Sequence, residues 1–381
     1  MTGDMSLGSI RPDQKPPRAL AIFNMEIGGT EQIVQQLVMG MKSEGVESEI
    51  LCIDGQIGSI GEALQKTAVP VHKLARKQGF DWSLMAGIRK RLREGWFDVV
   101  HCHQYTPWFY GWLAVPGTGA KVIFTEHGRF YPDRHRYKAM LLNPLMALFT
   151  PAVVAISNAT KKALVKYEFT PRKNIQLIFK GIFPLKRNDP EAKKLRDSLR
   201  IPGDAFVVGT VSRLDPVKNQ GMMLRAFKEF SEKRPDSYLL MVGDGPDKEK
   251  LISLANELGI RDRTMFTDFI NNPLHYLAAM NLFLLSSHTE GTSMTLLESI
   301  RLGIPAVAAN VGGSPEIIAE GVTGLLTESD NESSFAIALE ALCENENLRA
   351  GMVEGAQEQF NERFFASAMI CQYRLIYCEP Q

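Results

Sequence analysis

Short apolar runs alternate with helical patterns along almost the whole of this 381-residue chain. In the first half, runs rich in β-branched and aromatic residues are expected to form strands. They are Ala19–Asn24, Glu49–Ile53, Pro70–Lys73, Asp98–Cys102, Lys121–Glu126, Ala152–Ile156 and Ile175–Phe179. The helical patterns between them include Thr30–Glu44, Ser83–Glu94 and Asn158–Tyr167. This alternation is typical of βαβ units, in which helices cover a parallel sheet.

The alternation stops between Gly181 and Pro190, where two prolines occur without periodicity, and then resumes. Further strands are expected at Ala205–Val211, Ser237–Val242, Thr264–Thr267, Leu282–Leu285 and Ala306–Ala308. Helices are expected to begin at Lys218, Asp247, Pro273 and Thr292. The sequence therefore predicts an α/β protein with two Rossmann-like, doubly wound parallel-sheet domains that face each other across a cleft.

The predicted domain boundaries follow from this pattern. Residues 18–183 are expected to form the first domain, residues 184–190 a linker and residues 191–362 the second domain. Residues 1–17 are polar and contain three prolines, so they are expected to be disordered. Residues 363–381 are expected to form a C-terminal helix that can pack back on the first domain.

The formal net charge of zero conceals two halves of opposite charge. Residues 1–187 carry 25 Lys and Arg against 15 Asp and Glu, whereas residues 188–381 carry 18 against 28. A basic half indicates an anionic partner, which could be nucleic acid, a phosphorylated substrate or an anionic membrane surface. No nucleic-acid reader motif occurs, so nucleic acid is not an expected partner.

The cysteines and the longest uncharged stretch indicate in which cellular compartment the protein is expected. The five cysteines form no CxxC pair and no His/Cys cluster at ligand spacing, which favours a reducing cytoplasm. The uncharged stretch Ala139–Thr160 is interrupted by Asn143, Pro144 and Pro151, so it is not expected to span a membrane. A cytoplasmic protein is predicted, with peripheral attachment to the inner face of the cytoplasmic membrane as an additional hypothesis.

Two glutamates lie eight positions apart in the segment Glu290-Gly-Thr-Ser-Met-Thr-Leu-Leu-Glu298, directly after an expected buried strand. Ligands of such sheets bind beyond the carboxyl ends of the strands. The small residues Gly291, Thr292 and Ser293 allow a ligand to approach the backbone, and the start of the following helix favours an anion. Glu298 can accept hydrogen bonds from sugar hydroxyls. Together these features predict a nucleotide-sugar site.

Cations and glycines follow two other strands. Arg213 and Lys218 lie between a strand and a helix, where they could neutralise a diphosphate, although two solvated cations are the alternative. Gly28 and Gly29 follow the first strand and open a helix, so backbone there can approach an anionic ligand. A tight turn with Thr30 as the helix cap is the alternative reading of this glycine pair.

Histidines end two strands of the first half, in His101-Cys-His103-Gln104 and Thr125-Glu126-His127-Gly128. Their spacing does not supply a metal site. We interpret His101 as a buried structural histidine and His127 as a ligand contact. In the second half, Val242-Gly-Asp-Gly-Pro246 lacks the third glycine of a dinucleotide fingerprint, so a NAD pocket is not expected. The glycine pair in Val311-Gly-Gly-Ser-Pro-Glu316 fits a ligand loop or a helix cap equally well.

Taken together, these segments resemble the retaining glycosyltransferases of family 4, which have the GT-B fold. The resemblance covers roughly residues 18–362 and is strongest in the second domain. There, five motifs occur in the order of the family: Gly209–Asn219, Val242–Pro246, Glu290–Glu298, Gly312–Glu316 and Gly321–Leu326. The chain departs from the family at Thr292-Ser293, where many members carry an aromatic residue followed by glycine, and at Asp268, where glycine is frequent.

The resemblance implies a role for each motif. Arg213 and Lys218 would bind the donor diphosphate, and Glu298 the nucleoside ribose. Glu290 and the amides near Gly291–Met294 would hold the donor sugar and its phosphate. Further roles are implied for Gly28 and Gly29, facing the diphosphate from the other domain, for His127 beside the reacting carbon, and for Phe269 and Ile270, framing the base. No Asp-x-Asp pair occurs in a strand-end loop, so a site without metal or cofactor is expected.

The implied activity is transfer of a sugar from a nucleotide-diphosphate donor, expected to be UDP-linked, to a glycan or lipid-linked acceptor in cell-envelope polysaccharide or glycoconjugate synthesis. The first domain would bind a lipid-diphosphate-linked acceptor through its aromatic and basic residues. These are Trp108, Phe109, Tyr110, Trp112, Arg89–Arg91 and the segment Arg129–Lys138 with Arg134 and Arg136. An aromatic core and a solvated basic face are the alternative. The other functions considered are a nucleotide-sugar epimerase of the same fold and a non-catalytic nucleotide-sugar-binding regulator.

Overall fold

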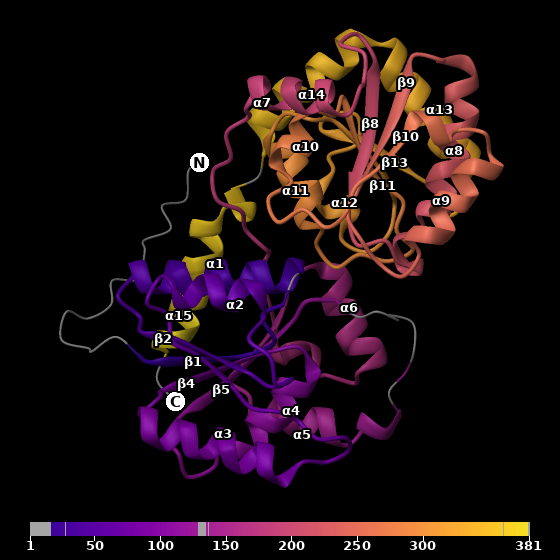
Figure 1. Cartoon of the computed structure of the whole chain (residues 1–381). Helices are drawn as coiled ribbons and strands as arrows, with labels where there is room; N and C mark the ends of the chain where they lie inside the picture. The colour runs from indigo at the N-terminus through magenta and orange to yellow at the C-terminus, as the bar shows by residue number, and fades with distance from the viewer. Residues whose placement is uncertain (1–16, 27, 129–134, 136, 361, 380–381) are drawn as a thin grey trace, which may run out of the picture.

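The computed structural model describes residues 17–26, 28–128, 135, 137–360 and 362–379. They form two α/β domains, each with its own parallel sheet, which confirms the predicted fold class (Figure 1). Residues 1–16 of the segment predicted to be disordered lie outside the described residues.

The N-terminal domain contains a seven-stranded parallel sheet with the order β3-β2-β1-β4-β5-β6-β7. The strands are β1 (Ala19–Ile22), β2 (Ser48–Cys52), β3 (Val71–Lys73), β4 (Val99–His103), β5 (Lys121–Glu126), β6 (Ala152–Ala155) and β7 (Ile175–Leu177). The helices are α1 (Gly29–Ser43), α2 (Gly58–Gln65), α3 (Trp82–Gly95), α4 (Tyr105–Ala114), α5 (Leu142–Leu148) and α6 (Asn158–Tyr167). The strand order reverses between β1 and β4, and this reversal places a crevice at the carboxyl ends of these strands.

The C-terminal domain contains a six-stranded parallel sheet with the order β10-β9-β8-β11-β12-β13. The strands are β8 (Phe206–Val211), β9 (Ser237–Val242), β10 (Thr264–Phe266), β11 (Leu282–Leu285), β12 (Ala306–Ala309) and β13 (Gly324–Thr327). The helices are α7 (Asp189–Ser198), α8 (Gln220–Lys233), α9 (Lys248–Glu257), α10 (Leu274–Ala278), α11 (Met294–Arg301), α12 (Ser314–Ile317), α13 (Glu332–Glu344), α14 (Glu346–Gln359) and α15 (Ala366–Cys378). The central strands β11 and β12 are buried along their whole length, since helices cover both faces of the sheet.

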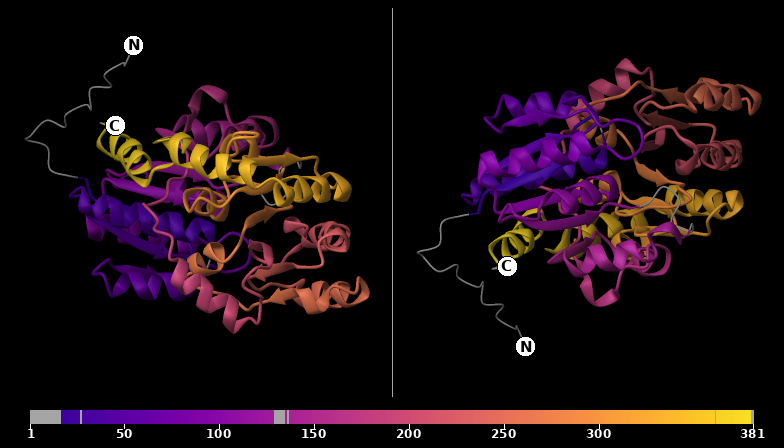
Figure 2. Two further views of the ribbon diagram at one scale, coloured as in Figure 1. Left: turned by 90° about the horizontal axis from the view of Figure 1, so that it is seen from above. Right: turned by 90° about the horizontal axis from the view of Figure 1, so that it is seen from below.

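Helix α15 crosses back and packs on the N-terminal domain, where it contacts α1 (Figures 1 and 2). Tyr377 Oη lies 2.8 Å from His101 Nδ1, and Tyr373 Oη lies 3.0 Å from Thr125 Oγ1. Lys121 donates a hydrogen bond of 2.7 Å to the carbonyl of Ile376. His101 is therefore completely buried beneath α15, in agreement with its interpretation as a structural histidine.

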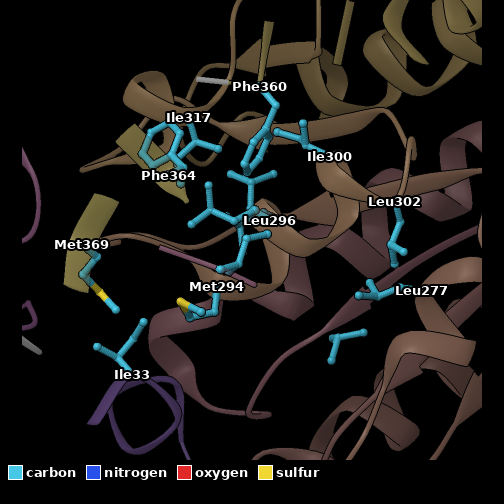
Figure 3. Packing of buried hydrophobic residues seen from close by; sticks show 14 of the residues in the cluster. Ile33, Leu277, Met294, Leu296, Ile300, Leu302, Ile317, Phe360, Phe364 and Met369 are labelled. Carbon is cyan, nitrogen blue, oxygen red and sulfur yellow. The ribbon is translucent and has the colours of Figure 1, made fainter. Parts of the chain in front are cut away.

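A hydrophobic cluster joins the two domains (Figure 3). It includes Ile33 from α1, Met294 from the start of α11 and Met369 from α15. All three side chains are at most 5% exposed. The start of α11, which lies within the Glu290–Glu298 motif, is therefore packed against the N-terminal domain. Burial of this apolar surface stabilises the contact between the two domains.

The aromatic residues of α4 do not form the predicted interfacial cluster. Trp108 is 1% exposed, stacks on Phe124 at a centroid distance of 4.1 Å and donates a hydrogen bond to Thr150. Tyr110 is also buried, and Phe109 and Trp112 pack against the same core. The helix carries apolar side chains all round, which places it in the core rather than at a membrane.

The basic residues expected beside α4 are largely engaged within the protein. Arg89 donates hydrogen bonds to the carbonyls of Leu113 and Ala114, which end α4. Arg91 pairs with Glu49, and Lys90 Nζ lies 3.8 Å from Glu94 Oε1. Arg89 and Arg91 are therefore engaged within the domain, whereas the Lys90 side chain is 74% exposed, and acceptor binding by Arg89–Arg91 stays a prediction. Arg134 and Arg136 lie outside the described residues.

Candidate functional site

A cavity of about 700 Å³ lies between the domains, at the carboxyl ends of both sheets. The structure brings all thirteen predicted site residues into its lining. They are Gly28, Gly29, His127, Arg213, Lys218, Phe269, Ile270, Glu290, Gly291, Thr292, Ser293, Met294 and Glu298. Residues distant in the sequence therefore converge, because parallel strands place their carboxyl ends at a common edge.

The N-terminal side of the cavity is formed by the start of α1. A Cβ atom at Gly28 would lie 2.3 Å from Glu31 Oε2, so glycine leaves room for this carboxylate to fold back over the helix end. Burial raises the pKa of Glu31, while the amides of Thr30 and Glu31 itself oppose that shift. The helix start thus carries an internal carboxylate within the cavity, where a diphosphate is expected to approach.

The C-terminal side contains a close ion pair. Lys218 Nζ lies 2.5 Å from Glu290 Oε1, and Ser287 Oγ donates to the same oxygen at 2.7 Å. Lys218 ends the short 3-10 helix η3 (Pro216–Lys218), which Asp215 caps by accepting a hydrogen bond from Val217 N. Helix α8 begins two residues later than predicted, at Gln220, since this turn comes first.

Arg213 is placed differently from Lys218. Its side chain is 71% exposed, and its Nε lies 3.7 Å from Asp215 Oδ2. Two glycines of the neighbouring loop allow this segment to pass closely: a Cβ at Gly243 would lie 2.1 Å from Ser212 O, and one at Gly245 2.2 Å from Leu214 O. The turn after β9 therefore forms part of the cavity wall through Val242, Gly243, Asp244 and Gly245.

The Gly312-Gly313 pair supports the loop that contains Glu290. Gly313 N donates to Glu290 O at 3.1 Å. A Cβ at Gly312 would lie 1.9 Å from Glu290 O, and one at Gly313 only 1.8 Å from Gly291 O. No other residue fits between these backbones. The helix-cap reading is confirmed, since Gly313 caps α12, whereas neither glycine of the pair is among the residues that line the cavity.

Thr292 and Ser293, the departures from the family pattern, both have structural partners. Thr292 Oγ1 donates a hydrogen bond of 3.0 Å to Ile156 O in the N-terminal domain. Ser293 caps α11 by accepting a hydrogen bond from Leu296 N. The hydroxyl of Thr292 thus joins the Glu290 loop to Ile156, the residue that directly follows β6.

A second interdomain contact is made by Glu316 in α12. Its carboxylate accepts hydrogen bonds from Asn158 N at 3.0 Å, from Asn158 Nδ2 at 2.8 Å and from Ala159 N at 3.1 Å. These groups form the start of α6, whose N-terminal amides favour a negative charge. Across the same seam, a Cβ at Gly291 would lie 2.6 Å from His127 O. The two domains therefore meet closely beside the cavity.

Glu298 projects from α11 into the cavity. Burial raises the pKa of its carboxyl to about 7. Among the described residues its side chain has no hydrogen-bond partner, and an unpaired buried carboxyl is costly to ionise. A ligand that donates hydrogen bonds to this carboxylate would relieve that cost.

His127 forms a buried pair with His103. His103 Nδ1 lies 2.9 Å from His127 Nε2. Burial lowers the pKa of His103 to about 3 and that of His127 well below its ordinary value, and the nearby Lys180 ammonium acts in the same direction. Both rings are therefore neutral at pH 7. His127 Nδ1 is buried without a hydrogen-bond partner among the described residues, although His127 itself lines the cavity.

Lys180 lines the cavity but was missed by the sequence reasoning. It is only 5% exposed. Burial lowers the pKa of its ammonium group to about 8, while the carboxylates of Glu290 and Glu31 oppose that shift. A signal was present, since Lys180 directly follows the strand predicted at Ile175–Phe179, at the same sheet edge as His127. Other lining residues that were not predicted include Thr30, Glu31, Gln32, Ser212, Asp215, Asp244, Pro273 and Thr295.

In the part of the chain with described positions, no three or more His, Cys, Asp or Glu side chains are grouped so that they could hold a metal ion. The helices among the same residues are all too short or too polar to cross a membrane.

Comparison with known proteins identifies the family. Residues 191–359 match the glycosyl transferases group 1 family, and residues 27–184 match glycosyltransferase family 4. N-acetyl-alpha-D-glucosaminyl L-malate synthase of Bacillus anthracis is 31% identical over 78% of this chain and 79% of its own. The chain belongs to the family 4 glycosyltransferases. This confirms the resemblance found in the sequence motifs.

A further sequence relative and a solved structure extend the comparison. An Escherichia coli UDP-Gal:alpha-D-GlcNAc-diphosphoundecaprenol alpha-1,3-galactosyltransferase is 26% identical over 68% of this chain and 70% of its own. Anabaena Alr3699/HepE, solved in complex with UDP and glucose, superposes with a TM-score of 0.85 at 21% identity, covering 96% of this chain and all of that one. The latter likeness establishes the GT-B fold of two facing domains.

Proposed function

We propose that this glycosyltransferase moves a sugar, with retention of anomeric configuration, from a UDP-linked donor to a glycan or lipid-linked acceptor in cell-envelope polysaccharide or glycoconjugate synthesis. One observation carries the proposal. Lys218, Lys180 and Glu290 lie around one cavity, opposite the start of α1. This arrangement suits a diphosphate between two domains and a sugar beside the glutamate.

The diphosphate is assigned to Arg213, Lys218 and the helix starts. When the sugar–phosphate bond breaks, negative charge develops on the leaving diphosphate, and fixed cations in a buried site stabilise it without reorganising. Lys218 is held in place by Glu290, whereas the exposed Arg213 can close over the phosphates as a two-pronged donor. The N-terminal amides of α11, and Gly28 and Gly29 at α1, would complete this anion site.

The nucleoside is assigned to the C-terminal domain. Glu298 would accept hydrogen bonds from the ribose hydroxyls, which would favour its charged form despite its burial. Phe269, with 43% of its surface exposed at the cavity, and Ile270 would frame the base. A UDP donor is supported by the relative whose name specifies UDP-Gal and by the fold neighbour solved with UDP and glucose.

Retention is assigned to attack on the same face as the departing phosphate, rather than to a covalent intermediate. Glu290 shares one of its oxygens with Lys218 and Ser287, which suits a positioning group better than a nucleophile. The neutral His127 would contact the donor sugar through its unpartnered Nδ1. Metal-free chemistry is part of the proposal, with cations supplied by the protein in place of a divalent ion.

The protein is proposed to act in the cytoplasm and to associate with an anionic membrane face that holds its acceptor. A lipid-linked acceptor is supported by the relative that acts on a diphosphoundecaprenol-linked sugar. A free anionic acceptor is the competing possibility, because the relative at 31% identity is named for L-malate. A nucleotide-sugar epimerase or a non-catalytic regulator of the same fold would need neither a lipid-linked acceptor nor a free anionic acceptor.

A thermal-shift screen against UDP, GDP, ADP and their sugars tests the donor. The stabilising nucleotide should raise the free energy of unfolding by about 2.7 kcal/mol at 100 times its dissociation constant. Product formation with the identified donor and a lipid-linked or glycan acceptor, followed by NMR of the new glycosidic bond, tests transfer and retention. Release of an epimerised nucleotide sugar without acceptor would contradict transfer, as would nucleotide binding without turnover of any acceptor.

A further inference from the structure

Helix α5 and its flanking residues form an exposed apolar surface, which we call the α5 face. Among the described residues, six large apolar side chains between positions 137 and 149 are 46% to 83% exposed. They are Tyr137, Met140, Leu141, Leu145, Leu148 and Phe149. In Figure 1, α5 lies on the side of the N-terminal domain that faces away from the C-terminal domain. The face is thus separate from the interdomain cavity.

The helix is apolar on both sides. Met146 and Ala147 are fully buried and hold α5 against the domain core. Leu141, Leu145 and Leu148 recur at the i, i+4 and i+7 spacing that defines the opposite side of a helix. A helix that is apolar all round is normally covered on every side, and large exposed apolar surfaces mark interaction sites. The outward side of α5 therefore indicates a partner.

Cations border the α5 face. Asn174 donates a hydrogen bond of 3.0 Å to Ala147 O, so the 3-10 turn η2 (Arg172–Asn174) adjoins the end of α5. Arg172 and Lys173 in this turn are exposed, and neither has an anionic partner among the described residues.

The one acidic residue in this stretch of the sequence does not offset this charge. Glu168 is the single Asp or Glu of the sequence between His135 and Arg187. It is 3% exposed, and its Oε2 accepts a hydrogen bond of 3.1 Å from Asn143 Nδ2 in α5. In the described part of this region, the outward surface therefore combines apolar side chains with positive charge that no described acidic side chain pairs, which is complementary to anionic lipid headgroups.

We propose that the α5 face inserts into the interfacial region of an anionic lipid bilayer, with Arg172 and Lys173 at the headgroups. This inference deepens the membrane association proposed above and rests on it. The segment is far shorter than a membrane span, so its leucines reach the headgroup–acyl boundary while the protein remains on one side. Tyr137 suits the same boundary, since it presents an apolar ring with a polar end.

Vesicle flotation of the full chain tests this surface. The wild type should float with vesicles of phosphatidylcholine and phosphatidylglycerol at low salt, and much less with phosphatidylcholine alone or at high salt. The L141S/L148S variant should bind the anionic vesicles about a hundredfold more weakly, from about 1.5 kcal/mol for each buried leucine. The R172Q/K173Q variant should bind about thirtyfold more weakly, from about 1 kcal/mol for each cation.

Matched controls separate the surface from general effects. The I337S/L375S variant removes two exposed apolar side chains elsewhere, and Lys250→Gln removes an exposed cation of the C-terminal domain. Both should float like the wild type. Circular dichroism and UDP binding, measured on the same samples, should be unchanged in every variant, because none of these residues lines the cavity.

Several results would overturn the proposal. The first is wild-type protein that fails to float with anionic vesicles. The second is L141S/L148S protein that floats as well as I337S/L375S protein. The third is a wild-type dimer that becomes a monomer in the L141S/L148S variant. The last result would make the α5 face a subunit interface. Flotation that depends on the α5 face in a protein that binds no nucleotide would support the docking surface while contradicting the proposed transferase function.

Discussion

Lys218 Nζ lies 2.5 Å from Glu290 Oε1, which ties the cation after β8 to the acidic loop after β11. The side chain of Glu290 is only 8% exposed and that of Lys218 is 25% exposed, so solvent screens the pair weakly. The two loops that the sequence motifs singled out are therefore joined before any ligand arrives. An ammonium group fixed in this way can stabilise a leaving diphosphate without first being ordered.

Replacement of Lys218 should reduce turnover far more than it affects the fold. Lys218→Gln keeps a hydrogen-bond donor near Glu290 but removes the charge, and should lower kcat about 10²–10³-fold. Steady-state kinetics with the donor found by thermal shift would measure the change. Lys250→Gln, which removes an exposed cation outside the cavity, is the control. Near-normal turnover in Lys218→Gln would remove Lys218 from the diphosphate site.

Glu298 should make stability depend on pH. Its carboxyl has a pKa of about 7 in the folded protein against 4.5 for an unburied glutamate, so the folded state favours the protonated form. The contribution of this group is fully present below about pH 4.5 and is lost as pH rises through about 7. The loss amounts to roughly 3 kcal/mol. Glu298→Gln should therefore be the more stable protein at pH 8, and urea unfolding at pH 5 and pH 8 would measure this difference.

The same substitution carries an opposite prediction for binding. Glu298→Gln should weaken UDP binding, because a neutral amide accepts hydrogen bonds from ribose less strongly than a carboxylate. Glu354→Gln, on the exposed side of α14, should change neither property. A Glu298→Gln protein that is no more stable at pH 8 and binds UDP normally would contradict both the burial of this carboxyl and its assignment to ribose.

Gly313→Ala should disrupt the Glu290 loop. The added methyl group would lie 1.8 Å from Gly291 O, so one of the two backbones must move. We expect a loss of about 1–3 kcal/mol in the free energy of unfolding and a larger loss of nucleotide affinity. Gly351→Ala in α14 is the matched control, because its Cβ would have no neighbour within 4 Å. It should stabilise the helix by about 0.5–1 kcal/mol. Equal thermal shifts for both variants would contradict this account of the glycine pair.

Glu316→Ala should loosen the domains. Without the carboxylate, Asn158 N and Ala159 N at the start of α6 lose their acceptor. We expect a loss of about 0.5–2 kcal/mol, as for the loss of a helix cap. Small-angle scattering should show a larger radius of gyration than in Glu257→Ala, which removes an exposed carboxylate of α9. If both variants keep the dimensions of the wild type, Glu316 does not hold the domains together.

The sequence predicted the two sheets and the lining of the cavity well, for a physical reason. Strands such as β11 and β12 lie in a sheet covered on both faces, so they are continuous apolar runs and their ends are easy to find. Once strand ends are known, parallel pairing places the loops after them at one edge. Strand β13 was missed because only two of its four residues are fully buried, at the edge of its sheet.

What the sequence did not reveal depended on tertiary contacts. An aromatic cluster such as Trp108–Trp112 has the same composition in a core as at a membrane, and only packing against Phe124 distinguishes the two. The α5 face was missed in the same way, since its outward leucines and the inward Met146 and Ala147 are equally apolar in the sequence. Lys180 was overlooked because a single lysine carries no motif, whereas its burial beside Glu31 and Glu290 becomes evident only in three dimensions.

The binding of UDP to wild-type protein and to Arg213→Ala, measured by isothermal titration calorimetry, tests the central claim most directly. Arg213 is 71% exposed and its Nε lies 3.7 Å from Asp215 Oδ2, so its removal costs one solvent-exposed ion pair and should leave the fold intact. We predict that UDP binds the wild type and Lys250→Ala equally, and that Arg213→Ala binds it at least about tenfold more weakly, from the loss of about 1.5 kcal/mol or more. Absence of UDP binding by the wild type, or equal affinity in all three proteins, would contradict the account.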